Sequence, residues 1–252
     1  MLRISEQHLI AMARRTFDDL RRPTPGKAKP VKYNQKLVEA RFIERLNRFA
    51  AIMEVNGERA LVHIANSGRL RELLTPDNTM YMTPAALRSN RKTAYALTLV
   101  GIGDLLVSAD ARAPNALLAE SLSEGRLEEF AGYNSITREV TMDDSRLDFR
   151  LSGPDGDCYI EAKSVTLVED GIALFPDAPT ARGAKHVRKL MSLVREGHRA
   201  AAVFVVQRPD SYALRPDADS DPEFHGVLIQ AVSSGVEARA YNCRVSLYAR
   251  FA

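Results

Sequence analysis

The chain has 252 residues, of which 45% are hydrophobic and 27% charged, and its formal net charge is +3. No window approaches the roughly 18 uncharged apolar residues that a membrane helix needs, and neither of the two cysteines belongs to a CxxC pair. This excludes a membrane-spanning protein, a disulfide framework and a thiolate zinc site, so we expect a cytoplasmic protein with a core large enough for one or two domains.

The basic residues are concentrated at the N-terminus. Residues 1–36 hold nine basic and three acidic side chains, which leaves 26 basic and 29 acidic side chains in the remainder. Apolar residues at helical spacing predict a short helix before Pro23, and the proline-rich segment 23–30 is typical of a linker. Such an arm favours contact with a polyanion, although a solvated tail would have the same composition.

Residues 37–100 are expected to form a small β-barrel. A strand-like segment, 42–55, is followed by Asn56-Gly57, the pair that best supplies the two positive φ angles of a type I′ turn, and then by a second strand, 59–64. Further strands are predicted at 79–82 and 93–100. Short strands separated by polar turns indicate a closed or nearly closed barrel of the OB type.

Residues 101–252 alternate between helices and strands and predict an α/β sandwich with a mixed sheet. A continuous apolar run at 200–206 is typical of a central strand covered on both faces. The other predicted elements are helices at 115–124, 182–195 and 227–233 and strands at 135–142, 146–151, 158–165 and 236–245.

The hairpin predicted by the second and third of these strands carries the candidate chemistry. Because side chains alternate along a strand, Glu161 and Lys163 lie on one face whatever the pairing. If Leu151 pairs with Cys158, Asp148 lies opposite Glu161, although the intervening loop does not fix that register.

Two facing carboxylates repel one another unless something positive lies between them. Mg²⁺ or Mn²⁺ prefers oxygen ligands from one or two carboxylates, and Lys163 could orient a water or offset transition-state charge, so the trio suits phosphodiester hydrolysis. The alternative is an amphipathic hairpin whose charged face is simply exposed to water. Its ion pairs would then be surface pairs that contribute little to stability.

The hairpin also resembles the D…(D/E)xK signature of the PD-(D/E)xK nuclease superfamily and, more specifically, the sugar fermentation stimulation protein A (SfsA) family. The resemblance covers about residues 37–245. Further segments that match family motifs are His63-Ile64-Ala65-Asn66-Ser67-Gly68-Arg69-Leu70, Asn90-Arg91-Lys92-Thr93, Pro114-Asn115-Ala116-Leu117, Phe175 to His186, and Val205-Val206-Gln207-Arg208-Pro209.

The resemblance implies an OB-like barrel followed by a PD-(D/E)xK nuclease-like α/β/α sandwich, in a protein that binds DNA. It implies Asp148, Glu161 and Lys163 as catalytic residues, with Asp148 and Glu161 as Mg²⁺ or Mn²⁺ ligands. The superfamily commonly adds an upstream acid, for which Glu139 is preferred over Glu120.

Several cations are candidates for nucleic-acid contact. The helix at 182–195 carries a basic stripe opposite its apolar one, and Gln207 is expected at the carboxyl end of the central strand. The candidate nucleic-acid-binding residues are Arg69, Lys92, Arg182, Lys185, His186, Lys189 and Gln207. Simple solvation is the alternative for the helix stripe, and His63 is expected to be a structural histidine.

Together these observations predict a DNA-binding protein with a divalent-metal-dependent nuclease site. A non-catalytic binding or regulatory protein with a vestigial nuclease fold is the main alternative, and a metal site that only stabilises the hairpin is a third. The choice between DNA and RNA, the strand form and the oligomeric state are left open.

Overall fold

The computed structural model describes residues 10–11, 37–84 and 93–247. They divide into two compact units: the described residues between 37 and 113 form one together with residues 244–247, and Pro114–Cys243 together with residues 10–11 form the other. Within these segments, no helix has both the length and the apolar character needed to cross a membrane.

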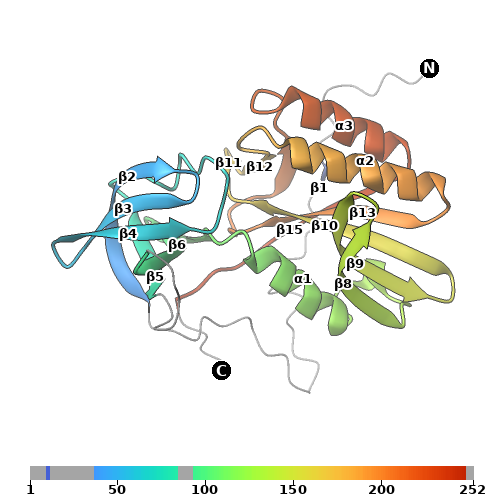
Figure 1. The fold of residues 1–252 in the computed structure, drawn as a ribbon, viewed down its shortest axis with the longest axis horizontal. Coiled ribbons are helices and arrows are strands. Elements are labelled where there is room, and N and C mark those ends of the chain that lie inside the picture. The colour runs from blue at the N-terminus through green and yellow to red at the C-terminus, as the bar shows by residue number, and fades with distance from the viewer. Residues whose placement is uncertain (1–9, 12–36, 85–92, 248–252) are drawn as a thin grey trace. The chain divides into compact units, whose positions relative to one another are not determined.

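The first unit is a closed β-barrel (Figure 1). Its strands are β2 (Val38–Asn47), β3 (Ala50–Val55), β4 (Glu58–Ile64), β5 (Thr79–Pro84), β6 (Tyr95–Ile102) and β7 (Leu105–Ser108). They pair in the order β4-β3-β2-β5-β6-β7, and a parallel pairing of β4 with β6 closes the barrel. This order, with five strands in the closed barrel, is that of an OB fold, as predicted.

Two local features of the barrel test the sequence prediction. Asn56 and Gly57 have φ angles of 51° and 84°, so the type I′ turn between β3 and β4 is confirmed. The single strand predicted at 42–55 is wrong, because the chain turns at Arg48 and forms two antiparallel strands there. The turn residues Arg48 and Phe49 are neither glycine nor proline, so the usual signal of a turn is missing there.

The second unit contains a five-stranded mixed sheet in the order β15-β13-β10-β9-β8. The first three strands are parallel, and the last three form an antiparallel meander. Their bounds are β8 (Ser135–Met142), β9 (Ser145–Gly153), β10 (Gly156–Val165), β13 (Arg199–Val206) and β15 (Glu237–Asn242). Every residue of β13 after Arg199 is buried, which confirms its prediction as a covered central strand.

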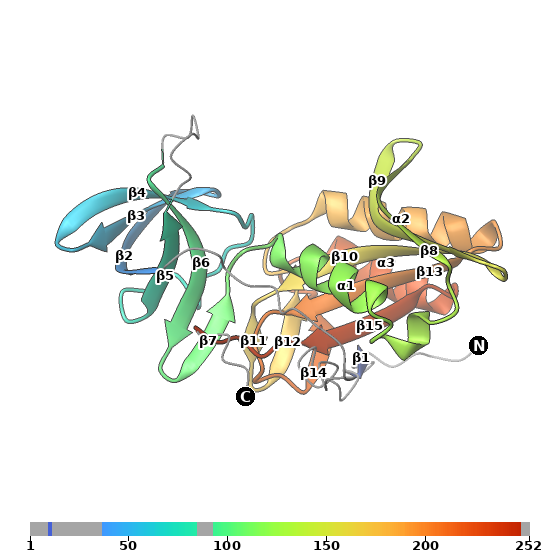
Figure 2. The same cartoon turned by 90° about the horizontal axis from the view of Figure 1, so that it is seen from below.

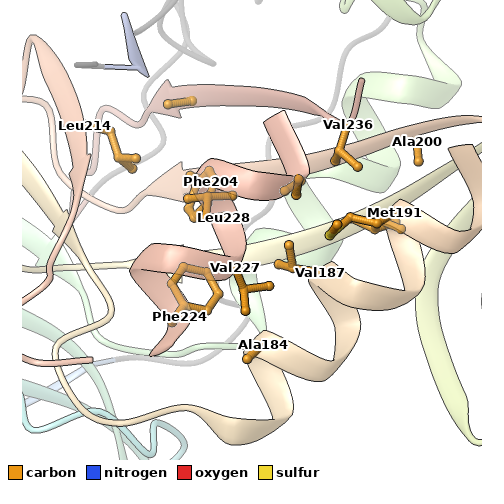
Figure 3. Packing of buried hydrophobic residues seen from close by; sticks show 14 of the residues in the cluster. Ala184, Val187, Met191, Ala200, Phe204, Leu214, Phe224, Val227, Leu228 and Val236 are labelled. Carbon is orange, nitrogen blue, oxygen red and sulfur yellow. The ribbon is translucent and has the colours of Figure 1, made fainter. Parts of the chain in front are cut away.

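Helices cover both faces of this sheet, with α1 on one side and α2 and α3 on the other (Figures 1 and 2). The helices are α1 (Ala113–Ser123), α2 (Ala181–Arg195) and α3 (Pro222–Ser233), with a short 3₁₀ helix at Glu128–Phe130. Figure 3 shows the apolar faces of α2 and α3 meeting over Phe204, where Val187, Val227 and Phe224 converge. The predicted α/β sandwich with a mixed sheet is therefore confirmed.

A second, smaller sheet was not predicted. It has the order β1-β14-β12-β11, with strands β1 (Ile10–Ala11), β11 (Val168–Glu169), β12 (Ile172–Phe175) and β14 (Ala213–Pro216). Ile10 and Ala11 pair with Leu214 and Ala213, so the predicted N-terminal helix is wrong at these two positions. The rest of that helix and the linker lie outside the described residues.

Both cysteines are predicted to be unreactive in the folded protein. Cys158 and Cys243 are both buried and form no disulfide with each other, and burial raises the pKa of the Cys158 thiol to about 11. Since the thiolate is the nucleophile, roughly one Cys158 in a thousand is reactive at pH 8. We therefore expect N-ethylmaleimide to label neither cysteine in the native protein and both in guanidinium, as measured by intact mass. Rapid labelling of the native protein would contradict the packing around β10.

Candidate functional site

The site is built on the antiparallel pair β9 and β10. The predicted register is confirmed, because Leu151 lies opposite Cys158 and the ladder continues to Phe149 opposite Ile160. The ladder ends there, before the predicted pairing of Asp148 with Glu161. Asp148 instead uses Oδ2 to accept the backbone N–H of Ala162 at 2.8 Å, which brings its carboxylate beside the strand that carries Glu161.

Glu161 and Lys163 are buried rather than solvated. Their residues are only 4% and 8% exposed, so the alternative of a charged hairpin face that merely meets water is wrong for this pair. Lys163 Nζ donates to Glu161 Oε1 at 2.7 Å. Because a buried charge is costly unless it is paired, this contact is what permits both groups to remain charged inside the protein.

His186 of α2 is the second partner of the same oxygen. It is 5% exposed, and its Nδ1 hydrogen-bonds to Glu161 Oε1. Arg182 Nε donates to His186 Nε2 at 3.4 Å, so Nε2 is the acceptor nitrogen of the ring. Nδ1 therefore carries the hydrogen and donates the hydrogen bond to Glu161 Oε1. The chain Arg182–His186–Glu161 therefore fixes the orientation of the carboxylate.

The other oxygen of Glu161 has no partner. Oε2 is buried and makes no hydrogen bond to any residue in the described part of the chain, whereas Oε1 accepts two. A buried polar atom without a partner costs about 1–3 kcal/mol, so such atoms usually have a function or a missing ligand. The arrangement leaves one carboxylate oxygen available to a cation.

Asp148 is held from two sides. Besides the Ala162 N–H on Oδ2, its Oδ1 accepts a hydrogen bond from Asn115 Nδ2 at 2.5 Å. Asn115 lies in the first turn of α1, 33 positions before Asp148 in the sequence. Asn115 was not among the predicted site residues, although it lies in the Pro114–Leu117 motif that supports the family resemblance, and that motif was the signal that could have identified it.

The two carboxyl groups have pKa values shifted in opposite directions. Burial, followed by the negative charge of Glu161, raises the pKa of Asp148, and the hydrogen bonds from Ala162 and Asn115 only partly oppose this. Burial also acts to raise the pKa of Glu161, but Lys163 and His186 more than offset it and the net shift is downward. The effect of the Glu161 charge on Asp148 agrees with the Asp148–Ala162 hydrogen bond, which holds the Asp148 carboxylate beside β10.

The donor set fits a small hard divalent cation. Mg²⁺ is typically held by one or two carboxylates, with waters and substrate phosphate completing its octahedron, and Asp148 with the bare Oε2 of Glu161 meets that requirement. No group of three or more His, Cys, Asp or Glu side chains that could hold a metal occurs among the residues the structure describes. The described residues therefore do not provide a complete set of protein ligands for a metal ion.

Glu139 is not brought to this pair. It has a φ angle of 59°, and it pairs with no residue of β9, although the register on either side sets its position opposite Asp148. Its carboxylate is 45% exposed and forms an ion pair with Arg146. The preferred third metal ligand is thus paired with Arg146, and the other candidate, Glu120, pairs with Arg126 at 3.1 Å.

The predicted basic stripe on α2 is only partly correct. Arg182 is exposed, but His186 is buried against Glu161 and does not belong to an exposed stripe. Lys185 and Lys189 form ion pairs with Asp144 and Asp143 of the β8–β9 turn, at 2.9 and 2.7 Å. The sequence did not predict these pairs because the acids lie more than 40 positions before the lysines.

The remaining candidates are dispersed over both units. Gln207 follows β13 as predicted, but it is buried, and its Nε2 donates to Ser164 Oγ at 2.8 Å. Its Oε1 has no partner among the described residues. Arg69 is exposed in the loop after β4, Lys92 lies outside the described residues, and the predicted structural role of His63 agrees with its 3.1 Å bond to Phe49 O.

Comparison with known proteins agrees with this architecture. Residues 43–109 match the model of the SfsA N-terminal OB domain, and residues 112–248 match that of the sugar fermentation stimulation protein RE domain. Sugar fermentation stimulation protein homologs from Desulforamulus reducens and Moorella thermoacetica are 45% and 47% identical to this chain. These matches cover 84% and 83% of this chain and 88% and 90% of the respective relatives.

A solved structure is also similar. It is Pyrococcus furiosus SfsA in complex with Ca²⁺, which matches at a TM-score of 0.78 and 30% identity and covers 86% of this chain and 93% of its own. The two domain models lie in the same order as the barrel and the α/β unit. The chain therefore belongs to the sugar fermentation stimulation protein (SfsA) family.

Proposed function

We propose that this protein binds DNA and hydrolyses phosphodiester bonds at a Mg²⁺- or Mn²⁺-dependent site formed by Asp148, Glu161 and Lys163. The observation that carries the proposal is the asymmetry of the Glu161 carboxylate, whose Oε1 has two donors and whose buried Oε2 has none. A purely structural ion cluster has no reason to leave that oxygen bare. The related Pyrococcus furiosus protein is described in complex with Ca²⁺, another hard cation that takes oxygen ligands.

Each residue has a distinct task in this proposal. Asp148 and Glu161 Oε2 hold the cation, and His186 keeps the Glu161 carboxylate in the required orientation. Lys163 is a buried ammonium beside the reacting phosphate, where it offsets developing negative charge or orients the attacking water. When bound, a divalent cation supplies Lewis-acid polarisation of the phosphate and a lowered pKa for water.

Phosphate contacts of the DNA are assigned to cations around this site. Arg182 is the best placed, because it is exposed and hydrogen-bonded to the histidine that contacts Glu161. Lys185 and Lys189 can contribute only where phosphate competes with their present partners, Asp144 and Asp143. Arg69, Lys92 and Gln207 remain candidates for other nucleic-acid contacts.

The test is a cleavage assay with single-stranded, double-stranded and branched DNA and with RNA, each with Mg²⁺, Mn²⁺ or EDTA. Turnover that requires the metal and is lost in Asp148 and Lys163 variants supports the proposal. Salt-sensitive binding without turnover on any substrate would favour the alternative of a binding or regulatory protein, since phosphate neutralisation alone gives salt dependence.

Binding of a divalent cation is expected to stabilise the protein. At a Mg²⁺ concentration 100 times the dissociation constant, linkage adds about 2.7 kcal/mol, or a rise of roughly 5–10 °C in Tm. Glu161→Gln removes the charge on the oxygen that lacks a partner and should abolish the rise, as measured by calorimetry. Because the pKa of Asp148 is raised, the effect should fade on acidification at a higher pH than an ordinary aspartate would require.

The matched control is Glu139→Gln, an exposed glutamate paired with Arg146. It should keep the full Mg²⁺-dependent rise in Tm. An equal rise in Glu161→Gln and the unmodified protein would contradict the assignment of Glu161 as a ligand.

A further inference from the structure

Two of the large apolar side chains exposed on this protein lie at one turn of the barrel. Leu46, near the end of β2, and Phe49, in the turn to β3, are each 51% exposed. The other large exposed apolar residues in the described segments are dispersed over the second unit: Ile136, Tyr212 and Val232. An aliphatic and an aromatic side chain therefore share one exposed turn, where a solvated loop would ordinarily carry polar residues.

The turn is held in place by one guanidinium group. Arg45 donates to the carbonyl oxygens of Asn47 at 3.1 Å, of Arg48 at 2.8 Å, of Asn66 at 3.4 Å, and of Arg69. Two of these carbonyls belong to the turn and two to the loop after β4. Arg45 therefore ties the two segments together and brings Arg69 next to the turn that carries Phe49.

The backbone of Phe49 is fixed as well. Its N–H donates to Asn47 Oδ1 at 2.9 Å, and its carbonyl accepts from Ile64 N at 2.9 Å and lies 3.1 Å from His63 Nδ1. A side chain on such a preorganised backbone loses little entropy when a ligand binds, which favours affinity. We refer to Leu46, Arg48, Phe49 and Arg69 as the barrel platform.

The charge of the barrel platform indicates the kind of ligand. Arg48 and Arg69 are exposed, and neither has an ion pair within the described ranges of the chain. A protein partner would suit the apolar pair alone, but two arginines beside an exposed aromatic ring match the alternation of phosphate and base in a nucleic acid. In OB barrels the loop between the first two strands is a recurring nucleic-acid contact.

We infer that the barrel platform is a contact site for single-stranded nucleic acid, in which one base stacks on Phe49 and phosphates pair with Arg48 and Arg69. The inference rests on the nucleic-acid-binding part of the proposed function but not on hydrolysis. Duplex bases are already stacked on each other, so an exposed ring of this kind selects an unpaired strand.

The chain has no tryptophan, which gives a direct test. In Phe49→Trp, the single indole should lose emission saturably when the protein is titrated in EDTA with oligo(dT) or oligo(U) of about 15 nucleotides. Parallel titrations with the two strands distinguish DNA from RNA. The matched control is Tyr212→Trp, an exposed aromatic position of the second unit, whose emission should not change.

Affinity measurements by fluorescence anisotropy complete the test. Phe49→Ala should weaken binding about tenfold, and Phe49→Tyr should restore it, since stacking on one ring is worth about 1–3 kcal/mol. Arg48→Ala and Arg69→Ala should each reduce the slope of log K against log salt by about 0.7. If Phe49 had only a structural role, Phe49→Ala would lower Tm but would bind the oligonucleotide with the same affinity as Phe49→Tyr.

The inference is overturned by unchanged emission of Phe49→Trp at saturating oligonucleotide, or by equal affinity of Phe49→Ala and the unmodified protein. If the same preparations still bind or cleave duplex DNA, the proposed function stands and only the barrel platform fails. If the unmodified protein binds no nucleic acid of any form, both fail.

Discussion

Replacement of Lys163 by methionine is expected to lower metal-dependent cleavage on the order of 1000-fold, because the lost ammonium is the cation nearest the Glu161 carboxylate inside a buried site. Asp148→Asn should have an effect of similar size, since it removes a charged oxygen from the cation's ligand set. Both effects should be measured in single-turnover reactions with end-labelled substrate. DNA affinity should be unchanged or slightly higher in Asp148→Asn, because a negative charge near phosphate is removed.

The matched control is Arg188→Met, which removes a cation from the exposed face of α2, where its partner is Glu223. It should cleave within a few-fold of the unmodified protein. Full activity in both Lys163→Met and Asp148→Asn would show that the cleavage arises elsewhere, and circular dichroism should establish that each variant is folded.

Replacement of Phe204 by alanine is expected to cost about 3–5 kcal/mol of unfolding free energy, the usual range for a fully buried aromatic. Phe204 is 0% exposed in the central strand β13, with its ring centroid 5.5 Å from that of Phe175. Its side chain lies beneath the faces of α2 and α3 in Figure 3, so no neighbour can easily fill the cavity. Urea denaturation followed by circular dichroism measures the loss.

Phe49→Ala is the control for this effect, because the same atoms are removed from an exposed position. Its cost should stay within about 0.5 kcal/mol, as for other surface substitutions. A Phe204→Ala protein no less stable than Phe49→Ala would contradict the placement of β13 at the centre of the sheet.

Elements whose signal is local were predicted well from the sequence. The apolar run at 200–206 is β13, the helix at 182–195 is α2, and the Asn56-Gly57 turn has both positive φ angles. Each depends on the periodicity or the turn preference of a few adjacent residues, and these are physical properties of the segment itself.

Elements that depend on distant pairing were not predicted. The two-residue strands β1 and β11 carry almost no pattern of their own, and β12 and β14 exist because they pair with each other across a gap of about 40 residues. The break between β2 and β3 was missed for a related reason. β2 ends where it pairs back onto β3, a partner that no local preference of the segment specifies, and the register of that pairing shifts on either side of Glu44 and Arg45.

The candidate site shows the same difference between local features, which the sequence predicts, and contacts between distant residues, which it does not. The sequence by itself determined that Glu161 and Lys163 share a face, because alternation along a strand is fixed by covalent geometry. Only the tertiary structure decided that they are buried, that His186 is a partner of Glu161, that Asn115 is a partner of Asp148, and that Glu139 pairs instead with Arg146. The contacts of His186 and Asn115 join residues 25 or more positions apart, and a distance of that kind is set by the packing of α1 and α2 on the sheet rather than by any local preference of the chain.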